Sequence, residues 1–257
     1  MLRSLRGLAG YRVSAIDGEL GEVIDVYFDD EHWSVRYLVV NTSEFWHGGH
    51  EVLISPNAFI RANWQDESIS LLLTQDKIRN SPPVDLAKPV SRQYEQKYFQ
   101  YYGWPYYWVY GLAPMLPPDK PANSRVEPHL YSVRDVTGYR IHASDGELGH
   151  VKDCIVDDET WTLRYWVIAT RNWLGKNVLV APRWIEKLDC DNESLRLNLP
   201  RQVVRNSPEW KPDEPINRTY EARLYDYYGR PAYWDDDTNE QPPRESNGGP
   251  RDTHTML

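Results

Sequence analysis

Asp17-Gly18-Glu19-Leu20-Gly21 is the stretch that decides the fold, because it returns unchanged as Asp145-Gly146-Glu147-Leu148-Gly149, 128 residues later. Asn80-Ser81-Pro82 likewise returns as Asn206-Ser207-Pro208, at an offset of 126 residues. One copy is therefore two residues shorter within a loop. Solenoid units span only roughly 20–50 residues, so a repeat of this length is a whole domain. The sequence predicts two tandem domains.

Each copy contains short β-rich runs separated by polar turns. Asp17-Gly18 favours a type I′ hairpin turn, which requires positive φ angles. Such runs at close spacing predict a small all-β sandwich or barrel. The runs are 10–13, 21–29, 35–40, 51–55 and 68–73 in the first copy, and 139–141, 149–157, 163–169, 177–181 and 194–199 in the second.

A helix rich in aromatic residues is expected to follow each set of strands. A short helical turn comes first in the first copy, at 74–80, capped by Thr74. The longer helices begin after Ser91 and Asn217, both good N-cap residues, and end at Gly103 and Gly229. Aromatic and apolar side chains lie on one face at helical spacing. They are Tyr94, Tyr98, Tyr101 and Tyr102 in the first copy, and Tyr220, Leu224, Tyr227 and Tyr228 in the second.

These signals divide the chain into four parts. Residues 1–111 form the first repeat with its helix, and residues 131–234 form the second. The proline-rich segment 112–130 is expected to be a semi-rigid linker. Residues 235–257 lack apolar periodicity and are expected to be disordered.

Composition limits the classes of partner. The net charge of −9 argues against nucleic acids and anionic membranes, which require a basic surface. The only cysteines, Cys154 and Cys190, have no zinc-site spacing and are expected to be free thiols in a reducing compartment. No apolar run is long enough for a signal peptide or a transmembrane segment. A cytoplasmic location follows as the expectation.

The order of the motifs resembles the PRC-barrel domain. The resemblance rests on Gly10 with Val13, the Asp17–Val23 stretch with Asp25, Tyr37–Val40 and Val52–Pro56, and on their counterparts in the second copy. This β-barrel is shared by the cytoplasmic domain of the photosynthetic reaction-centre H subunit and the C-terminal domain of a ribosome maturation factor. Stand-alone bacterial PRC-barrel proteins show similar Trp173–Lys176 and Tyr-Tyr-Gly elements.

The resemblance implies a mainly β fold of two tandem small barrels, each followed by its aromatic helix. Duplication of an ancestral homodimer commonly retains a self-complementary contact, so we expect the barrels to form an intramolecular pseudo-dimer about a pseudo-twofold axis. A further homo-oligomer stays open. The family acts as a docking module, which implies a protein partner and no enzymatic activity. The N-terminal membrane helix of a true H subunit and the second domain of the maturation factor are missing.

Candidate chemical groups each have a structural alternative. Asp25 and Asp153 within apolar strands could relay protons, but such residues more often accept backbone hydrogen bonds. The acidic clusters 29–31 and 157–159 lack the spacing of a calcium loop. His47 and His50 have no further ligand at zinc-site spacing. We therefore expect no metal, no cofactor and no catalytic residue.

The aromatic tails are the main candidates for an interaction surface, because Tyr and Trp are enriched at interfaces. The alternative is that they cover their own barrel. The candidates are Tyr98, Tyr101, Tyr102, Trp104, Tyr106, Tyr107, Trp108, Tyr227, Tyr228, Tyr233 and Trp234. We further expect Trp108 and Trp234 to occupy equivalent buried positions.

Three functional hypotheses follow. The first is a scaffold or adaptor that binds a protein partner. The second is a protein that senses a small molecule or an ion in the cleft between the barrels. The third, an accessory protein of photosynthetic reaction centres or electron transfer, depends on the resemblance alone.

Overall fold

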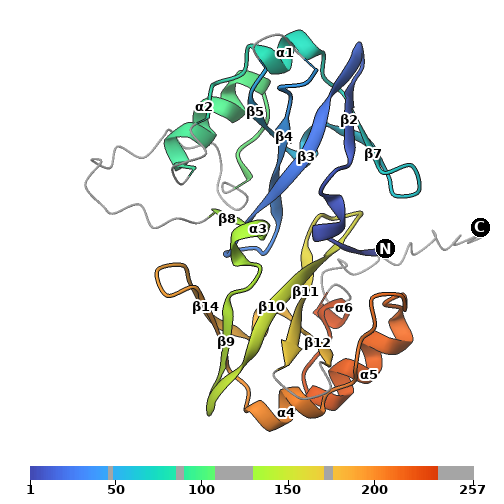
Figure 1. The fold of residues 1–257 in the computed structure, drawn as a ribbon, viewed down its shortest axis with the longest axis vertical. Coiled ribbons are helices and arrows are strands. Elements are labelled where there is room, and N and C mark those ends of the chain that lie inside the picture. Colours follow the sequence, from blue (N-terminus) through green and yellow to red (C-terminus); the bar gives the residue numbers. More distant parts are fainter. Residues whose placement is uncertain (46–48, 85–89, 108–129, 171–175, 237–257) are drawn as a thin grey trace, which may run out of the picture. The chain divides into compact units, whose positions relative to one another are not determined.

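The computed structural model describes residues 1–45, 49–84, 90–107, 130–170 and 176–236. The chain divides into two compact units, Met1–Ile216 and Asn217–Leu257. The first unit is mainly β and contains two mixed seven-stranded sheets, one for each repeat (Figure 1). The strands of both repeats therefore belong to one unit, and the division falls before the last two described helices rather than between the repeats.

The first sheet has the strand order β5-β4-β3-β2-β7-β6, and the second has the order β12-β11-β10-β9-β14-β13. In each, one pair is parallel, β2 with β7 and β9 with β14. The first sheet contains β2 (Arg12–Ala15), β3 (Gly18–Asp29), β4 (Val35–Asn41), β5 (Glu51–Ile54), β6 (Phe59–Asn63), β7 (Ser68–Leu71) and β8 (Leu130–Ser132). The second contains β1 (Leu2–Ser4), β9 (Arg140–Ala143), β10 (Gly146–Asp157), β11 (Leu163–Thr170), β12 (Asn177–Val180), β13 (Ile185–Asp189) and β14 (Ser194–Leu197).

The expectation of closed barrels is wrong, because both strand orders are open. Among the described residues, β5 pairs only with β4, and β6 only with β7. A 3₁₀ turn, Pro56–Ala58, carries the chain from β5 to β6. Pro56 has no N–H to donate to a ladder, so the two end strands turn a corner instead of pairing.

Each sheet receives its seventh strand from the segment that precedes the other repeat. Residues Leu2–Ser4 form β1, which pairs antiparallel with β10 of the second repeat. Residues Leu130–Ser132 form β8, which pairs antiparallel with β3 of the first. The long strands β3 and β10 have room for this because β2 and β9 pair only with their first halves. The strand exchange is reciprocal, and it joins the repeats into one unit.

A second set of backbone bonds joins the repeats where β4 and β11 begin. The N–H of Val35 donates to the carbonyl of Trp161 at 2.8 Å, and the N–H of Leu163 donates to the carbonyl of Trp33 at 2.6 Å. Both tryptophans have positive φ angles, 54° and 56°. Positive φ is unfavourable for a bulky residue and persists only where the surrounding contacts hold it.

The hairpin turns differ from the expected type I′. The two loop residues are Ile16 and Asp17, and neither has the positive φ that type I′ requires. Gly18 has a φ of 154°, and it is the first residue of β3. The carboxylate of Asp17 instead accepts from the N–H of Gln75 at 2.8 Å, so the turn caps the helix α1 (Gln75–Arg79). Asp145 accepts from Arg201 at the start of α4 (Arg201–Asn206) in the same way.

The helices of the first repeat begin and end where the sequence predicts. The side chain of Thr74 caps α1 (Gln75–Arg79), and that of Ser91 caps α2 (Arg92–Tyr102). Gly103 closes α2 in the left-handed conformation, with a φ of 74°. The apolar face of α2 packs on β4 and β5 around the buried residues Tyr37, Val39, Leu53, Val90, Tyr98, Phe99 and Leu130.

The second unit is described up to residue 236 and contains α5 (Arg218–Tyr228) and α6 (Tyr233–Asp236). Asn217 caps α5 by accepting from the N–H of Tyr220, and Gly229 closes it with a φ of 59°. Tyr233 donates to the carboxylate of Glu221 at 3.0 Å, which ties α6 to α5.

Most of the expected linker and tail lies outside the described residues. The exception in the linker is Leu130, which belongs to β8 and not to a connection. Within the part of the chain that the structure describes, no helix has the length and apolarity needed to cross a membrane.

Candidate functional site

An aspartate holds each exchanged strand, and it is buried in the first repeat and half-buried in the second. Asp25 is 6% exposed and follows a β-bulge at Ile24 of β3. Its Oδ2 accepts from the hydroxyl of Ser132 at 2.6 Å. Its Oδ1 accepts from the N–H groups of Arg134 at 3.1 Å and Val26 at 2.7 Å. Bulges re-aim side chains, and this one directs Asp25 at the strand from the other repeat.

Asp153 repeats this arrangement in β10. It accepts from the hydroxyl of Ser4 at 2.5 Å and from the N–H groups of Arg6 at 3.2 Å and Cys154 at 2.7 Å. We call these two sites the Asp25 socket and the Asp153 socket. The sequence does contain a signal for the two strands that enter these sockets. Leu2-Arg3-Ser4 and Leu130-Tyr131-Ser132 share the pattern Leu-x-Ser at the repeat offset of 128 residues.

The two carboxylates therefore act as hydrogen-bond acceptors, which was the alternative to a proton relay. Most of the donors come from a segment distant in the sequence. Burial raises the pKa of Asp25 and of Asp153 above the ordinary value of 3.8, against the opposing effect of the hydrogen bonds from Ser132 and Ser4. A raised pKa means that the folded chain binds the proton more tightly than the unfolded chain.

This sign gives a prediction for Asp25→Asn. The stabilisation by protonation is complete below the ordinary pKa of 3.8 and is lost as pH rises through the raised pKa. Asparagine keeps the acceptor for both N–H groups and does not titrate. We expect the free energy of unfolding of the wild type, relative to Asp25→Asn, to fall as pH rises from about 3.5 to 6.5. Chemical denaturation across this range measures it, and a pH-independent difference would contradict the prediction.

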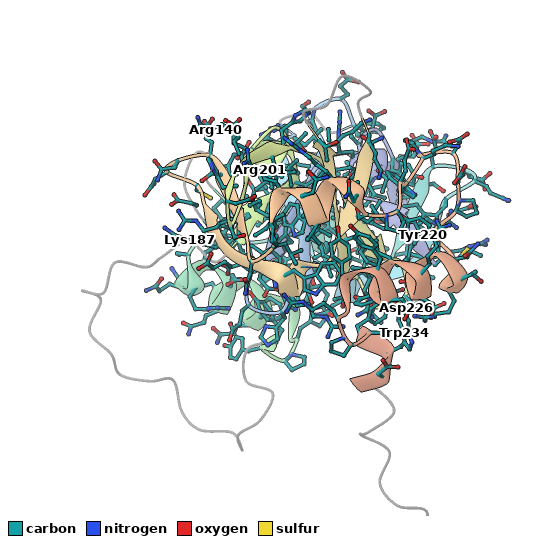
Figure 2. The ribbon with its side chains drawn as sticks, turned by 90° about the horizontal axis from the view of Figure 1, so that it is seen from below. Arg140, Lys187, Arg201, Tyr220, Asp226 and Trp234 are labelled. Atoms are coloured by element: carbon teal, nitrogen blue, oxygen red, sulfur yellow. The ribbon has the colours of Figure 1, made fainter. Side chains whose placement is uncertain are left out.

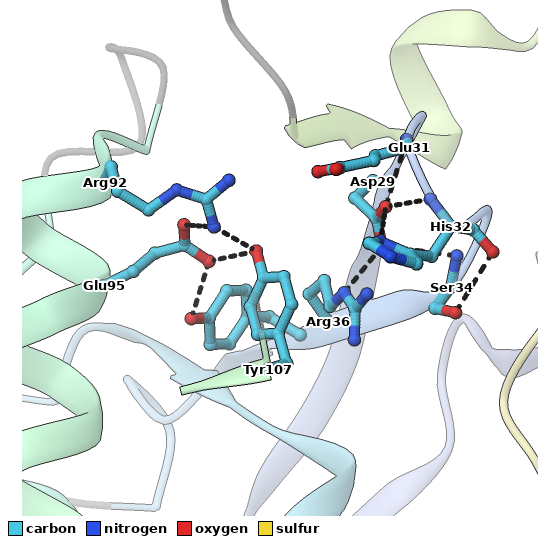
Figure 3. Close-up of polar contacts among 9 residues, drawn as sticks. Asp29, Glu31, His32, Ser34, Arg36, Arg92, Glu95 and Tyr107 are labelled. Atoms are coloured by element: carbon cyan, nitrogen blue, oxygen red, sulfur yellow. Dashed lines mark hydrogen bonds and ion pairs between the residues drawn. The ribbon is translucent and has the colours of Figure 1, made fainter. Parts of the chain in front are cut away.

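The first acidic cluster is satisfied by protein groups. Asp29 accepts from the N–H groups of Glu31 at 3.1 Å and His32 at 2.5 Å, and its Oδ2 lies 2.6 Å from Nε of Arg36 (Figure 3). The cluster thus closes the turn between β3 and β4. Among the described residues there is no group of three His, Cys, Asp or Glu side chains that could hold a metal; His47 lies outside them.

A buried glutamate that the sequence analysis missed lies on the side of α2 that faces the sheet. Glu95 is fully buried, and its Oε1 accepts from the hydroxyls of Tyr37 at 3.1 Å and Tyr107 at 2.8 Å. Arg92 lies 3.2 Å from its Oε2, and the guanidinium of Arg36 lies 3.6 Å from the ring centroid of Tyr107 (Figure 3). Burial and the charge of Glu95 raise the pKa of Tyr37 well above 10.0.

This network fastens the chain after α2 to the sheet. Glu221 has the equivalent position in α5 and binds Tyr233 and Arg218 in the second unit. The repeated spacing Arg-x-x-Glu, with a tyrosine 12 residues after the glutamate, was visible in the sequence. The network is structural, because the polar atoms that it buries have partners and hold the chain that follows the helix.

The aromatic candidates occupy several environments. Tyr98 is fully buried and donates to the carbonyl of Leu53 at 2.9 Å. Trp104 stacks on Tyr102, with ring centroids 4.6 Å apart. Tyr101, Tyr102, Trp104, Tyr106 and Tyr107 are half-buried, Tyr228 is buried, and Tyr227 is exposed. Trp234 and Tyr233 are half-buried, and Trp108 lies outside the described residues.

Three exposed apolar residues lie elsewhere, at the ends of β2 and β7 and in β6 of the first sheet. Ile16, Ile60 and Leu72 are 61%, 58% and 68% exposed. Ile16 and Leu72 follow the paired strands β2 and β7, and Ile60 lies in a bulge of the end strand β6. The N–H of Leu72 donates to the carbonyl of Ala58, which brings it beside the start of β6. We call these three residues the apolar patch.

The second repeat has polar residues at all three positions. The repeat offsets place Ser144, Glu186 and Asn198 there. The neighbouring Arg140 and Lys187, labelled in Figure 2, are exposed, as are Arg12 and Arg61 at the same positions of the first repeat. The first repeat therefore has exposed apolar side chains at three positions where the second has polar or charged ones, although the sheets share their strand order.

Comparison of the chain with family models and with curated proteins gives no match.

Proposed function

We propose that this chain is a non-enzymatic adaptor, related to PRC-barrel proteins, that binds a protein partner through the apolar patch on its first sheet. The observation that carries the proposal is the contrast at the patch. Three large apolar side chains are mostly exposed on one repeat, where the other has serine, glutamate and asparagine. Solvent exposure of adjacent apolar side chains marks interaction sites.

The position on β6 favours a protein partner. β6 is an end strand of its sheet, and an end strand offers unpaired backbone groups to another chain. Its counterpart β13 has Glu186 at the corresponding bulge, and such a charge protects a strand from unwanted pairing. The expected partner presents an apolar segment that packs on Ile60 and Leu72.

The strand exchange shows how such a repeat recognises a segment. Each sheet already pairs with three residues from outside its own repeat and fixes them through an aspartate. The same reciprocity supports a pseudo-twofold relationship between the repeats. The free thiols Cys154 and Cys190 suit the cytoplasm.

A matched pair of variants tests the proposal. The triple variant Ile16→Ser, Ile60→Glu, Leu72→Asn copies the second repeat, so it should fold. Ser144→Ala, Glu186→Ala, Asn198→Ala serves as the control. We expect proteins cross-linked to the wild type in its native cell to be lost with the first variant and kept with the control. An unchanged set of proteins would contradict the proposal. A concentration-dependent dimer that only the first variant abolishes would assign the patch to a second copy instead.

A small-molecule function between the repeats is supported by a cavity. A cavity of about 260 Å³ lies between the segments that the repeats exchange, lined by Leu5, Val133 and Asp25. Thermal unfolding with and without calcium, quinones and nucleotides tests it, since a ligand of the folded state raises the melting temperature. A role in reaction centres or electron transfer depends on the resemblance alone.

A further inference from the structure

We propose that the second repeat contains a binding site for an organic monocarboxylate with an apolar body, beside the exchanged strand β1. A cavity of about 600 Å³ lies between β1, β10 and the segment 210–216. This volume is within the range of small-molecule sites, roughly 300–1,000 Å³. All its lining residues belong to the unit Met1–Ile216.

Apolar side chains form part of the lining of the cavity. Leu2, Ile155, Val167 and Trp210 contribute to it. Trp210 is 8% exposed, and its indole N–H donates to the carbonyl of Glu214 at 3.2 Å. Because this polar atom is already bound, the ring can contact a ligand through its apolar surface.

The first repeat explains why the cavity exists. Ile24 and Tyr27 stand there at the positions of Lys152 and Ile155, and both pack against the hydrophobic core under α2. The residue that corresponds to Arg3 is Tyr131, which is buried. The second repeat thus replaces space-filling apolar groups with a smaller side chain and two cations at the same positions.

The cations select the charge of the ligand. Arg6 and Lys152 line the cavity together with Arg3. Arg6 donates to the carbonyl of Lys152 at 3.1 Å, and the Nζ of Lys152 lies 3.3 Å from Oδ1 of Asn177. A guanidinium has five N–H groups and an ammonium has three, so both side chains retain donors for a carboxylate. Arg3 is paired with Asp158 and is less available.

The acidic residues of the cavity disfavour a ligand with more than one negative charge. Asp213 and Glu214 line the opposite wall, and Glu214 pairs with Lys211 at 3.2 Å. Asp153 also lines the cavity, but it already accepts from Ser4 and Arg6. A polyanion such as a nucleotide would face these carboxylates, whereas a single carboxylate can lie at Arg6 and Lys152 with its apolar body toward Trp210.

Calorimetry with octanoate tests the site, with octanol, octylamine and inorganic phosphate as comparison probes. We expect octanoate to bind and to raise the melting temperature, and the other three to bind at least about tenfold more weakly. The double variant Lys152→Ile, Ile155→Tyr restores the residues of the first repeat and should fill the cavity. It should weaken octanoate binding at least about tenfold, whereas Lys152→Arg should change it less than about threefold.

The result that would overturn the proposal is octanoate binding of equal strength to the filled variant and the wild type, or no binding to the wild type. If the double variant does not fold, Lys152→Gln tests the same proposal, because it removes the cation and keeps the cavity. Octanoate should bind this variant more weakly than the wild type. Equal binding of octanol and octanoate would also contradict the role of the cations. None of these outcomes depends on the apolar patch, so the adaptor proposal is tested separately.

Discussion

Gly21→Ala is expected to destabilise the protein by about 3 kcal/mol or more, because the chain has no room for a side chain there. A Cβ at this position would overlap the carbonyl oxygen of Asn41 and lie 2.9 Å from its carbonyl carbon. These are backbone atoms of the neighbouring strand β4, so they can move only if the ladder between β3 and β4 opens. Equilibrium unfolding in urea measures the loss.

Gly7→Ala is the matched control, because its Cβ would meet only the side chain of Ser4, at 3.5 Å. We expect that variant to stay within about 0.5 kcal/mol of the wild type. Gly149→Ala should behave like Gly21→Ala, since its Cβ would overlap the carbonyl oxygen of Ala169. A Gly21→Ala protein as stable as Gly7→Ala would show that the close approach of the strands is not a constraint.

Glu95→Ala is expected to cost about 3–5 kcal/mol, the range for removing one member of a buried charged pair. The substitution removes the acceptor of the Tyr37 and Tyr107 hydroxyls and the partner of Arg92. Tyr37 is fully buried, so water does not replace the lost acceptor without entering the core.

Glu95→Gln separates the two contributions to this loss. The amide keeps one oxygen acceptor but loses the charge that pairs with Arg92. The free energy of unfolding of Glu95→Gln should therefore lie between those of the wild type and of Glu95→Ala. Glu22→Ala, at an exposed position of β3, controls for loss of a glutamate. If Glu95→Ala is as stable as Glu22→Ala, the network contributes nothing to stability.

Local signals in the sequence were sufficient for the helices α1, α2 and α5 and for most strands. The N-cap residues Thr74, Ser91 and Asn217 and the closing glycines Gly103 and Gly229 have the predicted roles. Such signals act within a few residues of the backbone groups that they satisfy, and they repeat at equivalent positions, so each half of the chain supports the other.

Features that depend on distant partners were not predicted. β1 and β8 are three residues long, and they exist as strands only because β10 and β3 lie beside them. β6 and β13 were missed as well, since a bulge interrupts the alternation of each. The apolar patch could not be predicted either, because Ile16, Ile60 and Leu72 come from separate segments that meet only in the folded chain. Glu95 was missed because a glutamate on an amphipathic helix is usually solvated.

The strand exchange has a consequence for synthesis on the ribosome. When Leu2–Ser4 has been made, its pairing strand, which ends at Asp157, has not been translated. The first sheet also lacks β8 until Leu130–Ser132 has been added. The first repeat therefore cannot complete its sheet from its own strands, so we expect the nascent chain to hold an unfilled edge on β3 until Leu130–Ser132, at the start of the second repeat, has followed. Translation pauses before that point would lengthen the interval in which another molecule could occupy the Asp25 socket.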